Sequence, residues 1–120
     1  EQSLFELRTR GFLPVMAHPE RYVAFHKDLD RLAQIGRSCP LVVDLGALGG
    51  THGLACKRAA RRLVLEGIAH AAASDVHSPS DLRGVAAGIE WLQKKLGPDG
   101  VTRLLAKNPQ AILAGEHPGE

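Results

Sequence analysis

The sequence predicts an α/β fold in which strand–helix units build a parallel sheet. Helix-like stretches alternate with short apolar runs, and each run ends in polar, loop-like residues. No internal repeat or low-complexity linker divides the chain, and its 44% apolar and 23% charged residues are typical of a folded protein. We therefore expect one domain over residues 1–114, followed by a loose tail over 115–120.

The positions of the elements follow from periodicity and from the glycines that end helices. We expect helices at 3–10, around 27–35, at 54–66 and from 78 to about 96, then two shorter helices, and strands at 13–17, 41–43 and 68–74. The strand at 41–43 is rich in β-branched residues, and the glycine-rich segment DLGALGGTHG after it is expected to be a loop.

The start of the helix at 78–96 has the clearest signal. Ser78 can cap it, Pro79 suits the first helical position, and Asp81 can return a hydrogen bond to the backbone. Gly97 and Pro98 should stop this helix. The last helix should begin at Asn108–Pro109 by the same logic of a cap followed by a proline.

Composition argues against several classes of function. The chain has 15 basic and 13 acidic residues, so its net charge of +2 does not indicate a nucleic-acid partner. We expect no membrane insertion, because no apolar run approaches about 20 residues. The spacing of Cys39 and Cys56 suggests reduced residues of a cytoplasmic protein. The basic residues Lys57, Arg58, Arg61 and Arg62 are more typical of a solvated helix face than of a binding patch.

Three strand exits carry candidate site residues, because the carboxyl ends of parallel strands meet at one rim. The exits read AHPERY, DLG and SDVH. Asp75 and His77 lie two residues apart in the third, so a continuing strand would point both to one side, together with the small residues Ala69, Ala71 and Ala73. A carboxylate and an imidazole suit manganese, iron or zinc. A helix-capping loop is an equally good explanation of this pattern.

The first exit places His18 directly after a strand and Arg21 three residues later. An imidazole can bind a metal while a guanidinium holds a phosphate through two parallel hydrogen bonds. Taken alone, His18 could equally be a core histidine, and Arg21 a surface residue paired with Glu20.

HPERY after one strand, ASDVH after another and NP opening the last helix together resemble the CpsB/CapC tyrosine-phosphatase family of the PHP superfamily. The resemblance spans nearly the whole chain. It implies a partial, distorted TIM-like (β/α)7 barrel of which this chain holds the later strands. The chain begins with Glu1 and is shorter than the roughly 250 residues of a complete barrel, so we expect upstream sequence that supplies the N-terminal half.

By this resemblance, His18, Asp75 and His77 are metal ligands and Arg21 contacts the substrate phosphate, and these four residues are the catalytic set. The complete site would hold two or three divalent ions, manganese first and iron, zinc, cobalt or magnesium as options. The family's earlier ligands, an H-x-H near the N-terminus and further acidic residues, have no counterpart here.

Glu20, Asp44 and Ser74 are expected to support the site from behind the ligands. The family often has N-A-G-S-L where this chain has D-L-G-A-L, so Asp44 could accept a hydrogen bond from a ligand histidine or, as a loop carboxylate, bond backbone amides.

The remaining histidines have no predicted role in the site. His70 and Asp75 are an odd number of residues apart, so on one continuous strand their side chains should point to opposite faces of the sheet. His26 and His117 lie in segments that we expect at the surface, and no role is assigned to His52.

The resemblance implies hydrolysis of phosphotyrosine on proteins, in control of capsular or exopolysaccharide synthesis, with a bacterial tyrosine kinase as partner and self-association left open. No cysteine nucleophile is expected, because neither cysteine lies in a phosphate-binding loop. Two alternatives remain: another PHP phosphomonoesterase, such as one acting on histidinol phosphate, or a non-catalytic barrel fragment that binds a partner.

Overall fold

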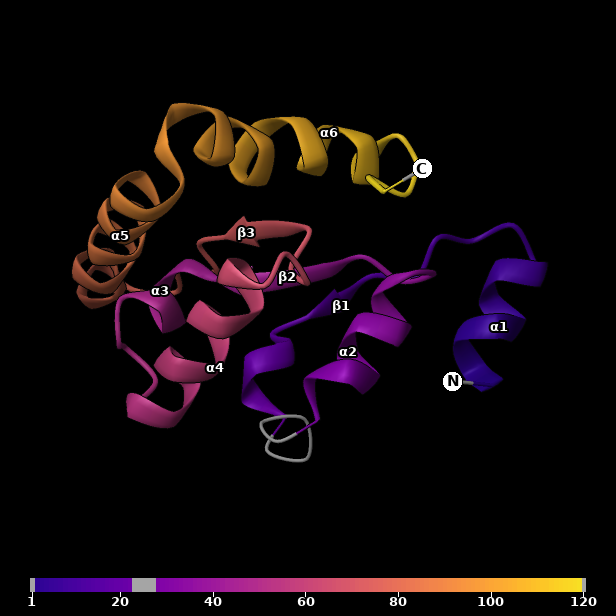
Figure 1. Ribbon diagram of the computed structural model, residues 1–120, viewed down its shortest axis with the longest axis horizontal. Helices are drawn as coiled ribbons and strands as arrows, with labels where there is room; N and C mark the ends of the chain where they lie inside the picture. Colours follow the sequence, from indigo (N-terminus) through magenta and orange to yellow (C-terminus); the bar gives the residue numbers. More distant parts are fainter. Residues whose placement is uncertain (1, 23–27, 120) are drawn as a thin grey trace.

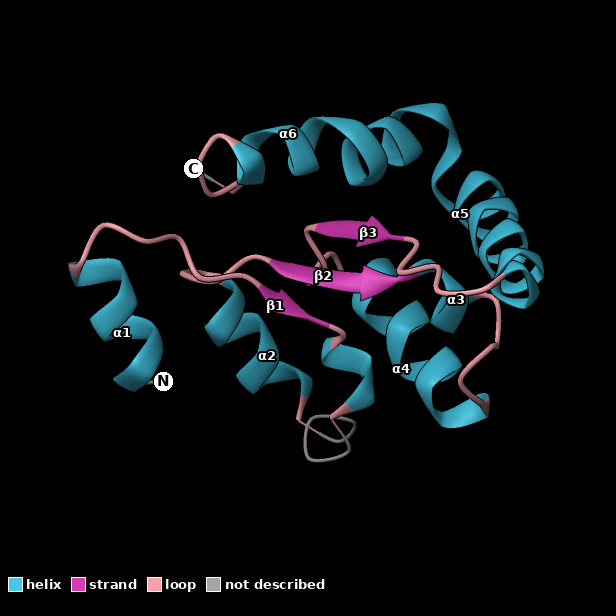
Figure 2. Cartoon of the chain, turned by 180° about the vertical axis from the view of Figure 1, so that it is seen from behind, coloured by secondary structure: helices cyan, strands magenta, loops and turns pink. Residues whose placement is uncertain are grey.

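The computed structural model describes residues 2–22 and 28–119, in which a parallel sheet has the strand order β1-β2-β3. The strands are β1 (Met16–Ala17), β2 (Leu41–Asp44) and β3 (Ala71–Ala73). Ala17 pairs with Val42, and Asp44 pairs with Ala73. All three strands point the same way (Figure 2), so their carboxyl ends share one edge of the sheet.

Helices lie on both sides of the sheet and at its two ends. They are α1 (Gln2–Thr9), η1 (Pro19–Arg21), α2 (Leu29–Gly36), α3 (Leu45–Leu48), α4 (Leu54–Leu65), η3 (Pro79–Asp81), α5 (Leu82–Thr102), η4 (Arg103–Lys107) and α6 (Asn108–Leu113). In both views α2 and α4 lie below the sheet and α6 lies above it, while α1 and α5 occupy opposite ends of the long axis (Figure 1). None of the described helices is both long and apolar enough to span a bilayer.

The core lies between the sheet and these helices. The strand residues Leu41 and Val43 are at most 1% exposed, and leucines from the helices cover them. The fully buried leucines of the helices are Leu32, Leu48, Leu63, Leu92 and Leu104. Removing such side chains from water is the main favourable contribution to folding, so this core holds the helices against the sheet.

Two glycines of α5 allow it to approach α3 backbone to backbone. A methyl group at Gly88 would collide with the carbonyl oxygen of Leu45, and one at Gly84 would collide with the side chain of Thr51. The segment that follows β2 is therefore held close against α5, by backbone contact at Gly88 and through the Thr51 side chain at Gly84.

The predicted alternation of strands and helices is confirmed, with shifts at the boundaries. The strands expected at 13–17 and 68–74 are shorter in the structure, where they span Met16–Ala17 and Ala71–Ala73. The reason is that the short β2 offers few residues with which they can pair. The expected loop after β2 is wrong at its start, where α3 forms. The helix expected around 27–35 is present from Leu29, and Lys27 lies outside the described residues.

The end of α5 and the start of α6 differ from the simple stop signals. The helix bends at Gly97, which has a φ of 68°, and then continues beyond Pro98 to Thr102. α6 does begin at Asn108, but the side-chain amide of Asn108 donates to the carbonyl oxygen of His70 over 2.6 Å. Asn108 thus ties this helix to the segment before β3.

Two histidines lie elsewhere than expected. His117 is buried, at 7% exposed, and its Nε2 lies 2.6 Å from the carbonyl oxygen of Gly36. His70 precedes β3, so strand parity does not apply to it, and its Nδ1 accepts a hydrogen bond from the amide of Leu41. Both lie at the amino-terminal end of the sheet, opposite the edge that carries the candidate site, and His26 lies outside the described residues.

Candidate metal centre

Polar side chains converge where the three strands end. His18 follows β1, Asp44 is the last residue of β2, and Asp75 lies two residues beyond β3. One ligand atom from each of these residues lies within 4.8 Å of the others, which makes them a candidate metal-binding group. The structure thus brings together one residue from each of the three predicted strand exits, and the role of His18 and Asp75 as metal ligands stays a prediction.

The backbone aims His18 and Asp75 at each other. Both residues have positive φ, 56° and 46°, although neither is a glycine. His18 Nε2 lies 3.2 Å from Asp75 Oδ2. A left-handed conformation at a non-glycine residue costs about 1–3 kcal/mol and tends to occur at functional sites. The fold therefore maintains this pairing against a local cost.

The donor set fits a divalent cation. An imidazole and carboxylates are ligands that manganese, iron and zinc accept. Two ligands about 2.1 Å from one ion and at right angles to each other lie about 3 Å apart, close to the separation of His18 and Asp75. The other ring nitrogen of His18, Nδ1, is buried and lies 3.7 Å from Glu20 Oε1, so Nε2 is the nitrogen that faces Asp75.

His77 lies beside this group but not in it. Asp75 and His77 both line the cavity at the strand ends, but strand alternation is not the reason, because β3 ends at Ala73. The His77 side chain is 77% exposed, and its Nδ1 lies 2.7 Å from the carbonyl oxygen of Asp75. Since a carbonyl can only accept, Nδ1 carries the proton and the lone pair of Nε2 is left for a ligand.

Asp44 is the polar centre of the site and is 2% exposed. Its Oδ1 accepts a hydrogen bond from the amide of Gly46 over 2.8 Å, which caps α3. Its Oδ2 accepts one from Arg21 Nη2 over 3.0 Å and lies 2.8 Å from His52 Nε2. The expectation of a carboxylate that bonds nearby backbone amides is confirmed.

Arg21 and Glu20 project from η1 in different directions. Arg21 is 39% exposed, and its Nη2 also lies 3.9 Å from Asp75 Oδ2. Glu20 is fully buried, and its Oε1 accepts a hydrogen bond from the amide of Asp44 over 3.2 Å. Burial raises the pKa of the Glu20 carboxyl. Glu20 thus anchors η1 to β2, while the Arg21 side chain lies toward the cavity at the strand ends.

A cavity of about 240 Å³ opens over these groups. It is lined by Arg21, Asp44, Gly46, Thr51, His52, Ser74, Asp75, His77, Asp81 and Val85. The lining brings together a guanidinium, carboxylates and imidazoles, which is the chemistry needed to bind an oxyanion next to a cation.

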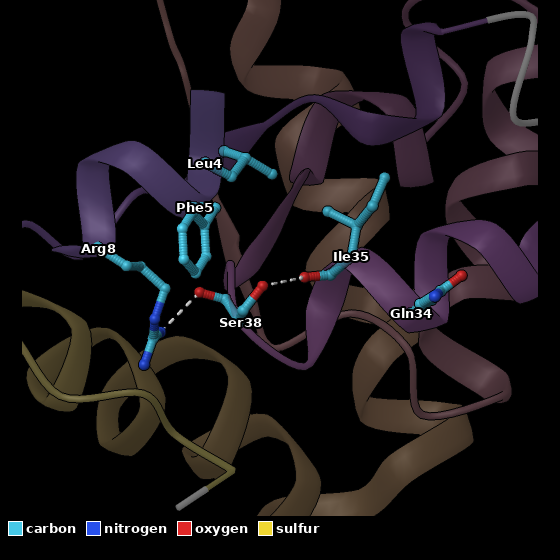
Figure 3. Close-up of a pocket in the computed structure, with 6 residues that line it drawn as sticks. All are labelled: Leu4, Phe5, Arg8, Gln34, Ile35 and Ser38. Atoms are coloured by element: carbon cyan, nitrogen blue, oxygen red, sulfur yellow. Dashed lines mark hydrogen bonds between the residues drawn. The ribbon is translucent and has the colours of Figure 1, made fainter. Parts of the chain in front are cut away.

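A second cavity, of about 310 Å³, lies between α1 and α2 (Figure 3). Arg8 Nη1 donates there to the carbonyl oxygen of Ser38 over 2.8 Å. Apolar side chains such as Phe5 and Ile35 also line it, and its lining contains neither a carboxylate nor an imidazole. The candidate centre is therefore the cavity at the carboxyl ends of the strands and not the one between α1 and α2.

One known protein family matches most of this chain. The sequence profile of the family described as "Capsular polysaccharide synthesis, CpsB/CapC" matches residues 1–114. The chain belongs to the CpsB/CapC family. The resemblance inferred from HPERY, ASDVH and NP is thereby confirmed.

Individual relatives of this CpsB/CapC chain are named as tyrosine phosphatases. The putative tyrosine-protein phosphatase CapC of Staphylococcus aureus is 33% identical over 64% of this chain and 31% of its own length. The tyrosine-protein phosphatase YwqE of Bacillus subtilis is 26% identical over 97% of this chain and 46% of its own length. The chain thus spans less than half of each relative.

A solved structure shares the fold. It is described as YwqE from Bacillus subtilis and CpsB from Streptococcus pneumoniae, unique metal-dependent tyrosine phosphatases. The match covers 96% of this chain and 47% of the other, with a TM-score of 0.81 and 26% identity. The small parallel sheet with its helices is therefore the fold of this part of a CpsB/CapC protein.

His52 of this CpsB/CapC chain was not predicted from the sequence. His52 lies in the loop between α3 and α4, eight residues after Asp44, and touches both Asp44 and Arg21. Following the whole loop after β2, rather than its first residues, would have included it among the residues at the strand exits.

Proposed function

We propose that this chain supplies the C-terminal half of the catalytic domain of a metal-dependent protein-tyrosine phosphatase. One observation carries the proposal: Arg21 lies beside the His18, Asp44 and Asp75 group, and it lines one cavity with Asp44 and Asp75 at the carboxyl ends of the strands. An anion-binding guanidinium next to a cation-binding group is the arrangement that phosphoryl transfer requires.

Within this proposal His18 and Asp75 hold a divalent ion, with His77 as a further ligand through Nε2. The Nδ1 contact of His77 with the Asp75 carbonyl supports that role, because it orients the ring. Asp44 already has Gly46, Arg21 and His52 around its two oxygens, so we assign it to holding Arg21. Glu20 and Ser74 support the site, Glu20 through the Asp44 amide and Ser74 in the cavity wall.

Arg21 would hold the phosphate of the substrate for in-line attack. Its contacts with Asp44, Asp75 and His52 all use Nη2 and so do not occupy Nη1 or Nε. A bound divalent ion would lower the pKa of a water molecule and offset charge on the phosphoryl oxygens. A tyrosine leaving group has a pKa near 10, so it needs little help from a separate acid. Cys39 is buried, so it is not a candidate nucleophile.

The wider setting of the proposal follows family membership. The complete protein would be a distorted PHP-type (β/α)7 barrel whose N-terminal half supplies further ligands for two or three ions, with manganese as the first choice. It would act in the cytoplasm on phosphotyrosine proteins, among them a bacterial tyrosine kinase, in control of capsule or exopolysaccharide synthesis.

The test is phosphate release from a phosphotyrosyl peptide by the complete parent protein, with Mn²⁺ and after chelation. We expect turnover that chelation abolishes, and a loss of at least 10²-fold in kcat/KM in His18→Ala and Asp75→Ala. Asp99→Ala, an exposed aspartate of α5, is the matched control and should retain full activity.

The other outcomes separate the alternatives. Turnover of histidinol phosphate but not of the phosphotyrosyl peptide would indicate another PHP phosphomonoesterase. No turnover with any divalent metal would leave the binding-module alternative. Activity that survives both His18→Ala and Asp75→Ala would remove this assignment of the site.

A further inference from the structure

Three side chains from three separate segments meet at one carboxylate oxygen. Arg21 Nη2 donates to Asp44 Oδ2 over 3.0 Å, and His52 Nε2 lies 2.8 Å from both of these atoms. Arg21 comes from η1, Asp44 from the end of β2 and His52 from the loop before α4. The three atoms form a nearly equilateral triangle. Whether His52 Nε2 carries a proton therefore decides whether its contact with Asp44 Oδ2 is a hydrogen bond.

Proton counting assigns the tautomer of His52. If Nε2 lacked a proton, its lone pair would face the Asp44 carboxylate at 2.8 Å. If Nε2 carries the proton, it donates to that carboxylate, and hydrogen bonds to a charged acceptor are the stronger kind. The 2.8 Å contact between Nε2 and Arg21 Nη2 is then a contact between two donors that share Asp44 Oδ2 as their acceptor, and not a hydrogen bond. We therefore assign Nε2–H, so that Asp44 Oδ2 accepts from Arg21 and His52 while Oδ1 accepts from Gly46.

The position of His52 is held by its neighbour in the chain. The amide of Thr51 donates to the carbonyl oxygen of Gly46 over 2.9 Å, and the Thr51 side chain fills the space that a side chain at Gly84 would need. The loop that carries His52 is therefore fixed to both α3 and α5.

Burial strengthens the contacts at Asp44. Asp44 is 2% exposed, whereas the side chains of Arg21 and His52 are 39% and 35% exposed. The carboxylate is thus covered while its two partners face the cavity. Solvent screens a buried carboxylate weakly, so Asp44 can hold a partly exposed guanidinium in one orientation.

We propose that His52 is a positioning residue for phosphate recognition. Through Asp44 it holds the Arg21 guanidinium toward the cavity that Asp75 also lines. This inference rests on the proposed function for the identity of the anion. It adds a residue to which the sequence analysis assigned no role. Without the His52 hydrogen bond, Asp44 would have a second acceptor site unfilled and Arg21 could turn away from the cavity.

The experiment measures the dissociation constant of inorganic phosphate by calorimetry, in the complete parent protein loaded with Mn²⁺. Phosphate binding needs no turnover, so the result is independent of the substrate. We expect His52→Ala to weaken phosphate binding roughly five- to tenfold, the effect of losing about one hydrogen bond. His52→Gln should restore binding to within about twofold, because its amide can also donate to Asp44.

Two further measurements separate positioning from a general loss of structure. In an Arg21→Ala background, His52→Ala should have no further effect on phosphate binding, because its target is gone. The affinity for Mn²⁺ should be unchanged in His52→Ala. The matched control is His70→Asn, at the other end of the sheet, which should bind phosphate like the wild type.

Each alternative result has one meaning. The positioning role would be overturned if the effects of Arg21→Ala and His52→Ala on phosphate binding were additive, or if His52→Gln did not restore binding. It would also be overturned if His52→Ala bound phosphate like the wild type or did not bind it detectably. Loss of Mn²⁺ affinity would make His52 a metal ligand instead. If phosphate binding depends on His52 but phosphotyrosine is not hydrolysed, the positioning role of His52 stands and the proposed function fails. If phosphotyrosine is hydrolysed but phosphate binding does not depend on His52, the proposed function stands and the positioning role fails.

Discussion

Arg21 Nη2 donates to Asp44 Oδ2 over 3.0 Å, and this bond joins the segment after β1 to the end of β2. It uses one nitrogen of a planar group with five N–H donors. The rest of the guanidinium can therefore bind an oxyanion while Asp44 keeps it in place. Lysine could not do both, because its ammonium is a single point charge.

Arg21→Lys in the complete protein is therefore expected to lower kcat/KM for a phosphotyrosyl peptide roughly 10²-fold although the positive charge is kept. Steady-state kinetics with bound Mn²⁺ measures this. Arg58→Lys, on the exposed face of α4, is the matched control. A loss of less than threefold in Arg21→Lys would show that charge alone is sufficient.

Metal binding is expected to stabilise the protein. A ligand present at 100 times its dissociation constant stabilises the folded state by about 2.7 kcal/mol. Mn²⁺ should therefore raise the melting temperature of the complete protein, and His18→Ala should reduce this rise. Calorimetry with and without a chelator measures both. An equal rise in His18→Ala would place the ion elsewhere.

Asp44 has a structural role that can be separated from its charge. Asparagine keeps an oxygen that can accept from the Gly46 amide, whereas alanine removes the cap of α3. Asp44→Ala should unfold more easily than Asp44→Asn by about 1 kcal/mol. Urea unfolding of both variants tests the difference, and coincident midpoints would show that capping contributes nothing.

The close approach of α3 and α5 predicts a strict size limit. Gly88→Ala would place a methyl group against the carbonyl oxygen of Leu45, so the helices must separate at a cost of about 1–3 kcal/mol. Thermal unfolding measures the loss. Ala87→Ser, on the exposed side of the same helix, should change stability by less than about 0.5 kcal/mol. A similarly small effect in Gly88→Ala would mean that the helices can separate freely.

Burial, and then the neighbouring His117, lower the pKa of His70. The folded state therefore binds a proton less tightly than the unfolded state, so His70 lowers stability as the pH falls from about 7 to about 5. His70→Asn keeps an acceptor for the Leu41 amide without titrating and should show a weaker dependence on pH. Urea unfolding across this range measures it; parallel curves for the two proteins would contradict the prediction.

Much of the fold was predictable because its signals are local. Alternating apolar runs and helical stretches identify the strands and helices, and the Asp81 carboxylate does accept from the amides of His77 and Ser78 as the capping pattern predicts. Strand lengths were not predictable in this way. They depend on how many residues of the neighbouring strands pair, which is a property of the assembled sheet.

The sequence by itself determined the family, the order of the elements, and the positions of His18, Arg21 and Asp75 at strand exits. Only the tertiary structure decided that His52 reaches Asp44 and Arg21, and that His77 stands beside the cluster with its ring turned by the Asp75 carbonyl. The physical reason is that periodicity specifies which way a side chain points within a regular element. Beyond the last paired residue of a strand, the direction of a side chain depends on the local backbone conformation and on packing against other segments.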